Sequence, residues 1–363
     1  MMKRTTIAPV SERRSGVTSC VKNEKSGITV IAAPNSLFFL LALLLLLPSL
    51  VLADRITAQT SVAGFFDSNI EHLAVWDALT MGKRSGFFIR NEGAFDYVFG
   101  DNDAFSTAFS LSSDTGLNVP EKSRLNSFFE IGWHGEPRDD LSLDLALQAH
   151  HTAENYLHMR NMFLDLLVTG DLFWDFSDDD AFYSTVKASY FTGFDEDLRY
   201  MTGPTIGAEF GYFYYPTART DYLKVGAGFD GAFFRPERWT SCSVTLSVKN
   251  ASIKPYLLFE GKYDLKPVFL KGTLRYAYME WLEEDRFIIT DIKDWSKKRK
   301  EHTPSLSTQI LWDINDYISL SLNYTYRYIF SNFSRNNGAY VDYTMDRHTV
   351  MLEFSAHYEG ETK

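Results

Sequence analysis

The chain has 363 residues, a formal net charge of −11, 45% hydrophobic residues and 15% aromatic residues. This hydrophobic content excludes a disordered chain, and the presence of only one long apolar run excludes a polytopic helical membrane protein. The acidic balance argues against nucleic acid as a partner, because binding of a polyanion needs a basic surface.

Residues 1–53 have the pattern of a cleaved signal peptide. Basic residues precede an unbroken apolar run from Leu37 to Leu47, and Pro48 ends that run. Val51 and Ala53 place small side chains at the positions that a signal peptidase reads before Asp54. A membrane anchor is the alternative, but a spanning helix needs about 20 apolar residues. The segment holds six Lys or Arg and two Asp or Glu, which leaves 30 Lys or Arg against 45 Asp or Glu in residues 54–363.

Residues 54–363 repeat a period-two alternation of apolar and polar side chains, which is typical of β-strands. In 317–330 the even positions are apolar or aromatic from Ile318 to Phe330, while the odd positions from Ser319 to Arg327 are polar. We interpret Val244, Leu246 and Val248, which also alternate, as an outer extension of the strand predicted at 251–263, the tenth in the chain. The pattern predicts fourteen strands, at 56–66, 86–99, 104–113, 126–134, 141–152, 161–176, 181–192, 204–214, 222–233, 251–263, 268–281, 304–313, 317–330 and 347–358.

The connections between these segments alternate in length. Short turns rich in Asp, Asn, Pro and Gly lie between longer connections, which include 67–85, 234–250, 282–303 and 331–346. A transmembrane barrel sorts its connections in this way, because its periplasmic turns are short and its external loops are long. A soluble β-protein with an aromatic core is the alternative, and it leaves this alternation unexplained. The predicted fold is therefore an all-β, transmembrane, antiparallel up-and-down barrel of about fourteen strands, spanning residues 54–363.

The alternating strands and connections together resemble bacterial outer-membrane β-barrels. The last strand, from His348 to Tyr358, is similar to the C-terminal signal read by the barrel-assembly machinery, although Glu359 to Lys363 follow the aromatic residue. The segment Gly64 to Asn69 is similar to the first-strand end of many such barrels. The resemblance implies a multi-pass protein of the outer membrane of a diderm bacterium, with outer-membrane lipid and the assembly machinery as partners.

The alternation also predicts which charges face the lumen. Acidic side chains gather on the second to sixth strands and basic ones on the tenth to thirteenth, so the two groups form opposed arcs across the barrel. The net acidity predicts a mild preference for cations. The predicted pore-lining acidic residues are Glu92, Asp96, Glu130, Asp144, Asp165, Asp171 and Asp175, and the basic ones are Lys254, Lys262, Lys271, Arg275 and Arg327.

A porin-like channel for small hydrophilic solutes or ions is the function that these features favour, without a cofactor or a metal. The first predicted strand begins close to Asp54, so no N-terminal hatch is expected in the lumen. The alternative is an adhesin or structural barrel that acts through loops 234–250 and 282–303 on a surface ligand. An outer-membrane hydrolase is a third hypothesis, but His134, His150 and His357 form no recognisable catalytic constellation with a serine, and we predict no enzyme activity.

Overall fold

The computed structural model describes residues 55–68, 85–100, 104–154, 162–194, 202–216, 220–234, 237–240, 244–248, 251–289, 292–332 and 345–361. The predicted signal peptide lies outside these residues and stays a prediction. Apart from one short 3-10 helix, η2 (Pro120–Lys122), every element among them is a β-strand. No helix in the described part of the chain is long and apolar enough to cross a membrane.

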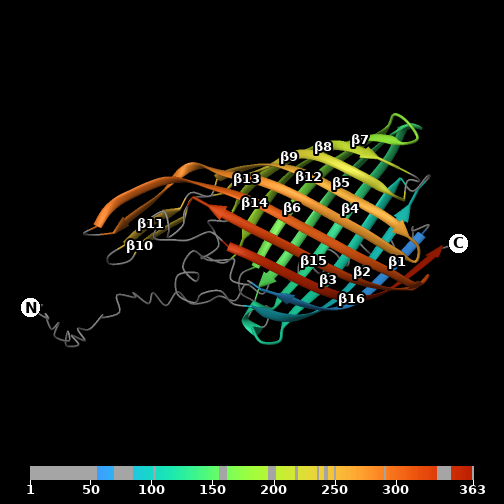
Figure 1. Ribbon diagram of the computed structural model, residues 1–363, viewed down its shortest axis with the longest axis horizontal. Helices are drawn as coiled ribbons and strands as arrows, with labels where there is room; N and C mark the ends of the chain where they lie inside the picture. Colours follow the sequence, from blue (N-terminus) through green and yellow to red (C-terminus); the bar gives the residue numbers. More distant parts are fainter. Residues whose placement is uncertain are drawn as a thin grey trace, which may run out of the picture.

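Fourteen strands form a closed antiparallel barrel, in which each strand is tilted relative to the long direction of the molecule (Figure 1). All fourteen predicted segments are confirmed as strands. Their bounds are β1 (Arg55–Asp67), β2 (Gly86–Phe99), β3 (Phe105–Gly116), β4 (Arg124–Arg138), β5 (Leu141–Glu154), β6 (Met162–Asp175), β7 (Asp180–Gly193), β8 (Gly203–Tyr214), β9 (Tyr222–Phe233), β12 (Ala251–Leu265), β13 (Val268–Ile289), β14 (Ile292–Asn315), β15 (Ile318–Ser331) and β16 (Met345–Glu361).

The first and last strands close the ring. Strand β1 pairs with β16 without a register shift, from Arg55 opposite Glu361 to Asp67 opposite Thr349. The last strand thus continues past Tyr358, the aromatic residue at which the sequence pattern ended it. Closure pairs the backbone groups that an open sheet would leave exposed at its two edges.

The outer surface of the barrel is apolar. On each strand the large exposed side chains alternate with polar ones that face inward, as shown by Val62 on β1 (53% exposed), Leu147 on β5 (54%) and Leu257 on β12 (63%). Exposed aromatic residues such as Trp174 and Tyr212 lie near the strand ends, where interfacial girdles form. An apolar exterior on a closed ring of tilted antiparallel strands is the fold of a transmembrane β-barrel.

The structure corrects the predicted loops at 234–250 and 282–303. The first contains two further strands, β10 (Glu237–Thr240) and β11 (Val244–Val248), so Val244 to Val248 are not an extension of the tenth barrel strand. The second is the continuation of β13 and β14, which pair with each other as far as Ile289 and Ile292.

The four strands β10, β11, β13 and β14 form a sheet that projects beyond one end of the barrel, opposite the end where the chain terminates (Figure 1). Strand β11 pairs with the outer part of β13, from Val244 opposite Ile289 to Ser247 opposite Arg286. Register shifts at Glu280/Glu284 and Phe287/Ile289 interrupt the β13–β14 ladder, and such bulges bend a ribbon and increase its twist.

A basic residue on the outer face near the middle of a strand should destabilise the barrel. We predict that Leu147→Arg lowers the free energy of unfolding in a bilayer by about 2–4 kcal/mol, because the charge would then face hydrocarbon. Ala146→Arg, on the neighbouring inward-facing position, is the matched control and should cost much less. Reversible denaturant unfolding from lipid vesicles measures both, and equal losses would contradict the assigned faces.

Candidate functional site

The candidate site is the inner wall of the barrel, where polar and charged side chains replace the apolar residues of the outer surface. Cross-strand pairing places the charges predicted from the sequence on the face opposite the exposed apolar residues of the same strands, such as Val168, Leu257 and Leu274. The residues in question are Glu92, Asp96, Glu130, Asp144, Asp165, Asp171, Asp175, Lys254, Lys262, Lys271, Arg275 and Arg327.

Several of the predicted acidic residues are held by neutral or weakly basic partners on adjacent strands. Glu130 accepts a hydrogen bond of 2.6 Å from the Gln148 amide, and Asp171 accepts one from Thr185. Asp144 lies 2.7 Å from Nδ1 of His134. None of these three partners is a lysine or an arginine.

The remaining predicted acids occupy separate levels of the same side. Asp165 lies directly opposite His150 in the ladder between β5 and β6. Glu92 and Asp96 follow Arg90 along the inner face of β2, where Asp96 pairs with Ala108 of β3. Among the described residues, these carboxylates do not converge on a single point, so they form a wall and not a compact site.

The basic arc also contains acidic side chains, which pair with its lysines and arginines. Lys271 contacts Glu260 at 3.1 Å, and Arg275 contacts Asp230 at 3.2 Å. Asp230 also forms an ion pair with Lys187, in which Nζ and Oδ1 are 2.6 Å apart. Lys187 and Asp230 were not among the predicted pore-lining residues, although they follow the same alternation on β7 and β9.

A cluster of tyrosines around Glu209 lies against the wall formed by β7, β8, β9 and β12. The Glu209 carboxylate accepts hydrogen bonds from Tyr183 (2.6 Å) and Tyr256 (2.7 Å) and contacts Lys224 at 3.0 Å. A Cβ at Gly226 would lie 2.3 Å from the Tyr183 hydroxyl oxygen. Glycine at this position therefore lets the tyrosine lie flat on the wall and keeps its bulk out of the lumen.

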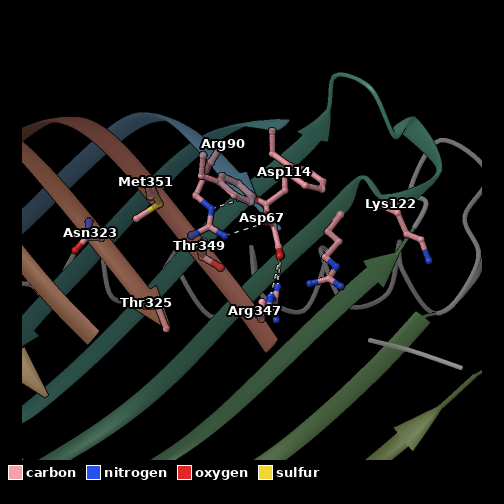
Figure 2. A pocket seen from close by; sticks show the side chains of 12 residues that line it. Asp67, Arg90, Asp114, Lys122, Asn323, Thr325, Arg347, Thr349 and Met351 are labelled. Carbon is pink, nitrogen blue, oxygen red and sulfur yellow. Dashed lines mark hydrogen bonds and ion pairs between the residues drawn. The ribbon is translucent and has the colours of Figure 1, made fainter. Parts of the chain in front are cut away.

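A cavity of about 240 Å³ opens in the inner wall near the end where the longer connections join the strands (Figure 2). Its polar residues come from both sides of the β1–β16 seam, and its apolar surface includes two aromatic rings. The lining residues are Phe65, Asp67, Phe88, Arg90, Asp114, Lys122, Arg124, Asn323, Thr325, Arg347, Thr349 and Met351.

Two ion pairs organise this cavity (Figure 2). Arg90 donates from Nε (2.7 Å) and from a terminal nitrogen (3.0 Å) to the two oxygens of Asp114. Arg347 donates from Nε to both oxygens of Asp67, at 3.0 and 2.9 Å. Both carboxylates are buried, whereas the guanidinium groups stay partly exposed to the cavity. The bidentate contacts fix the arginine side chains on the wall.

The aromatic floor of the cavity is held by the connection between β3 and β4. Phe65 stacks on Phe88 with ring centroids 4.7 Å apart, and buried Val119 packs against Phe88. A Cβ at Gly116 would lie 2.4 Å from the Val119 carbonyl oxygen, so glycine is needed for this connection to approach the wall. The connection therefore folds back against the barrel and carries Lys122 of η2 to the cavity.

The short turn between β4 and β5 lies at the opposite end of the barrel. Two hydrogen bonds, the larger contribution from Arg138 and the smaller from Trp174, hold the pKa of the Asp140 carboxyl below its usual range. The indole Nε1 of Trp174 donates to Asp140 at 3.0 Å. The turn thus anchors an aromatic residue of the outer surface at the predicted interface.

Within the described residues, no group of three or more His, Cys, Asp or Glu side chains is arranged to hold a metal ion. His134 lies between Asp144 and Glu136, but the Glu136 contact is 3.5 Å long. His150 approaches Gln148 at 3.1 Å. His357 lies on β16 opposite Gln59 of β1.

No protein-family model matches the chain, and no curated protein sequence matches it. Solved structures with a similar strand arrangement include OccAB3 of Acinetobacter baumannii, with 10% identity, a TM-score of 0.42, and coverage of 85% of this chain and 100% of the other. OmpF of Salmonella typhi has 10% identity, a TM-score of 0.44, and coverage of 84% and 98%. The outer membrane channel DcaP of Acinetobacter baumannii has 9% identity, a TM-score of 0.40, and coverage of 83% and 96%. These low values place the chain in no named family.

Removing one carboxylate of the cavity should destabilise the barrel, because the arginine bound to it would lose its partner. Asp114→Asn leaves the partly buried Arg90 without a carboxylate, and we predict a loss of about 2 kcal/mol in the free energy of unfolding. The double variant Arg90→Gln/Asp114→Asn should recover part of this loss, because it removes the orphaned charge as well. Asp140→Asn, in the exposed turn, is the control and should change little. Denaturant unfolding checks all three, and a double variant that recovers nothing would refute the argument.

Proposed function

We propose that the protein is a porin-like channel of the outer membrane of a diderm bacterium, through which small hydrophilic solutes or ions diffuse passively. One observation carries this proposal: a closed ring of strands is apolar on its outer surface and charged on its inner wall. A barrel that spans lipid must satisfy its backbone groups internally, and a charged interior is typical of water-filled barrels.

The number of strands bears on whether the interior holds water. Barrels of eight strands are filled by their own side chains, whereas those of 16 to 18 strands leave an aqueous channel. Fourteen strands give an intermediate diameter. The tyrosine cluster around Glu209 and the β3–β4 connection both lie against the wall, which supports a lumen that holds solvent.

The pore-lining role of the predicted charges is part of this proposal. The acidic group from Glu92 to Asp175 and the basic group from Lys254 to Arg327 would face water across the lumen. Charged rings on a pore wall favour polar solutes and ions over apolar ones. Transport of this kind needs no bond to be made or broken, so the proposal assigns the chain no enzymatic step and no cofactor.

Two partners follow from the same proposal. Outer-membrane lipid would cover the apolar outer surface, and the barrel-assembly machinery would read β16. The alternating apolar residues of this strand, among them Val350, Leu352 and Phe354, are exposed on the outer face, where a partner that guides insertion would contact them.

The proposed function predicts conductance. In planar bilayers the purified protein should form ion-conducting channels, and in proteoliposomes it should admit a pentose faster than a disaccharide because the lumen is narrower than that of larger porins. Liposome swelling with a series of sugars measures this size dependence. Barrels that are folded by gel mobility but remain electrically silent would exclude the channel.

The projecting sheet favours a second candidate function, which is recognition of a surface ligand. Strands β10 and β11 and the outer parts of β13 and β14 extend beyond the barrel (Figure 1), and an exposed sheet edge is a template for strand addition by a partner. A variant that lacks residues 283–297 should keep its conductance while losing any such binding to whole cells. Unchanged cell binding after this deletion would remove the candidate.

A further inference from the structure

A transverse row of arginines crosses the inner wall on neighbouring strands. In the ladder, Arg275 of β13 lies opposite Ser305 of β14, which lies opposite Arg327 of β15. Arg327 in turn lies directly opposite Arg347 of β16. Like charges in directly opposed positions destabilise a sheet, so this arrangement needs a compensating negative charge.

Two other arginines line the same cavity from the other side of the seam, and each of them has its own acid. Arg90 lies opposite Asp114 and is bound to it, and Arg124 contacts Glu154 at 3.1 Å. The charges of these two arginines are therefore balanced by the carboxylates that bind them.

Around the row itself, on the strands that run from β16 through β12 to β7, the cations exceed the acids. Lys254 and Arg327 have no ion pair within the described residues. Lys254 lies opposite Asp230 in the ladder between β12 and β9, and it is within electrostatic reach of Asp230 and of three cations, Lys187, Arg275 and Arg327. Glu301 also lies within electrostatic reach of Arg327, but it faces Arg299 at 4.0 Å, so this pair adds no net charge.

Counted over the described residues, five cations share two carboxylates, which leaves an excess of three positive charges. The cations are Lys187, Lys254, Arg275, Arg327 and Arg347, and the carboxylates are Asp67 and Asp230.

The side chains of Arg275 and Arg327 are partly exposed, and each keeps one donor without a partner. Nε of Arg275 and Nε of Arg327 are both buried and have no hydrogen-bond acceptor among the described residues. The Arg275 guanidinium lies 3.7 Å above the Tyr256 ring, which holds it against the wall. A guanidinium presents a rigid fork of donors that matches the two oxygens of a carboxylate or a phosphate.

We propose that this cationic row, formed by Lys254, Arg275, Arg327 and Arg347, binds the oxyanion group of a small solute, either a carboxylate or a phosphate. The row adjoins the cavity at Arg347. The cavity is also lined by two hydroxyl side chains and one amide, those of Thr325, Thr349 and Asn323, which offer polar contacts to the rest of the solute. This inference deepens the proposed function and rests on it for its role in transport, because it names the solute class that the wall would retain. It also reverses, at this level of the lumen, the cation preference expected from the net charge.

Equilibrium binding to the detergent-purified full barrel tests the proposal. Isothermal titration would use sodium succinate and sodium phosphate as probes, with sodium chloride and glucose as references. We expect at least one of the two oxyanions to bind, and Arg327→Gln to weaken that binding by about tenfold or more, the effect of losing a charge-assisted hydrogen bond. Arg327→Lys should fall between the two, because it keeps the charge and loses the fork.

Lys262→Gln is the matched control, since it removes one positive charge from the same wall near the opposite end of β12, where Lys262 pairs with Lys271. It should leave the affinity unchanged. Gel mobility confirms that each variant is folded, and Arg275→Gln replaces Arg327→Gln if the latter does not assemble. Absence of binding by both probes, or equal weakening by Arg327→Gln and Lys262→Gln, would overturn the proposal.

The two proposals fail in different ways. Oxyanion binding by a barrel without conductance would support the cationic row and exclude the channel. Conductance without oxyanion binding would exclude the row and leave the channel in place. If both are present, the reversal potential in a salt gradient should shift toward cation selectivity in Arg327→Gln and not in Arg327→Lys.

Discussion

Pairing of the backbone across every strand is the constraint on which the rest of the structure depends. In hydrocarbon an unpaired N–H or C=O group costs several kcal/mol, so the sheet must close on itself. Closure assigns one face of each strand to lipid and the other to the lumen, and a shift of one residue would exchange the two faces. The uninterrupted ladder between β1 and β16 therefore stabilises the ring and also keeps each charge on the inner wall.

The inner wall shows two ways of placing charge in this ring. On one side of the seam, bidentate pairs such as Arg90 with Asp114 neutralise each other in place. On the other side Asp230 forms ion pairs with both Lys187 and Arg275, and the cations outnumber the carboxylates. A wall built only from matched pairs would carry no local excess of charge. In the proposed channel, the excess of positive charge beside this row would produce a field across the lumen, by which solutes of different charge would be distinguished.

The fourteen barrel strands and their faces were predictable because period-two alternation is a local property of the sequence. The inward positions of residues such as Asp144 and Arg327 followed from it directly. The opposition of Arg327 and Arg347 was not predictable, because it depends on the register between strands, which the alternation restricts only to every second residue. Strand β10 was missed because it has only four residues, and the alternation of β11 was assigned to the neighbouring barrel strand because the two are close in the sequence. The outer parts of β13 and β14 were missed because their mixed charges resemble those of an exposed loop.

The seam between the first and last strands has a consequence for how the protein is made. Arg55 and Glu361, which pair there, lie at opposite ends of the described chain, so the contact with the greatest sequence separation is also the one that completes the ring. Contacts of this kind slow folding, because the entropy of closing the chain must be overcome before they form. The nascent polypeptide therefore has open edges until its final segment is synthesised, and it needs protection from aggregation on the way to the membrane.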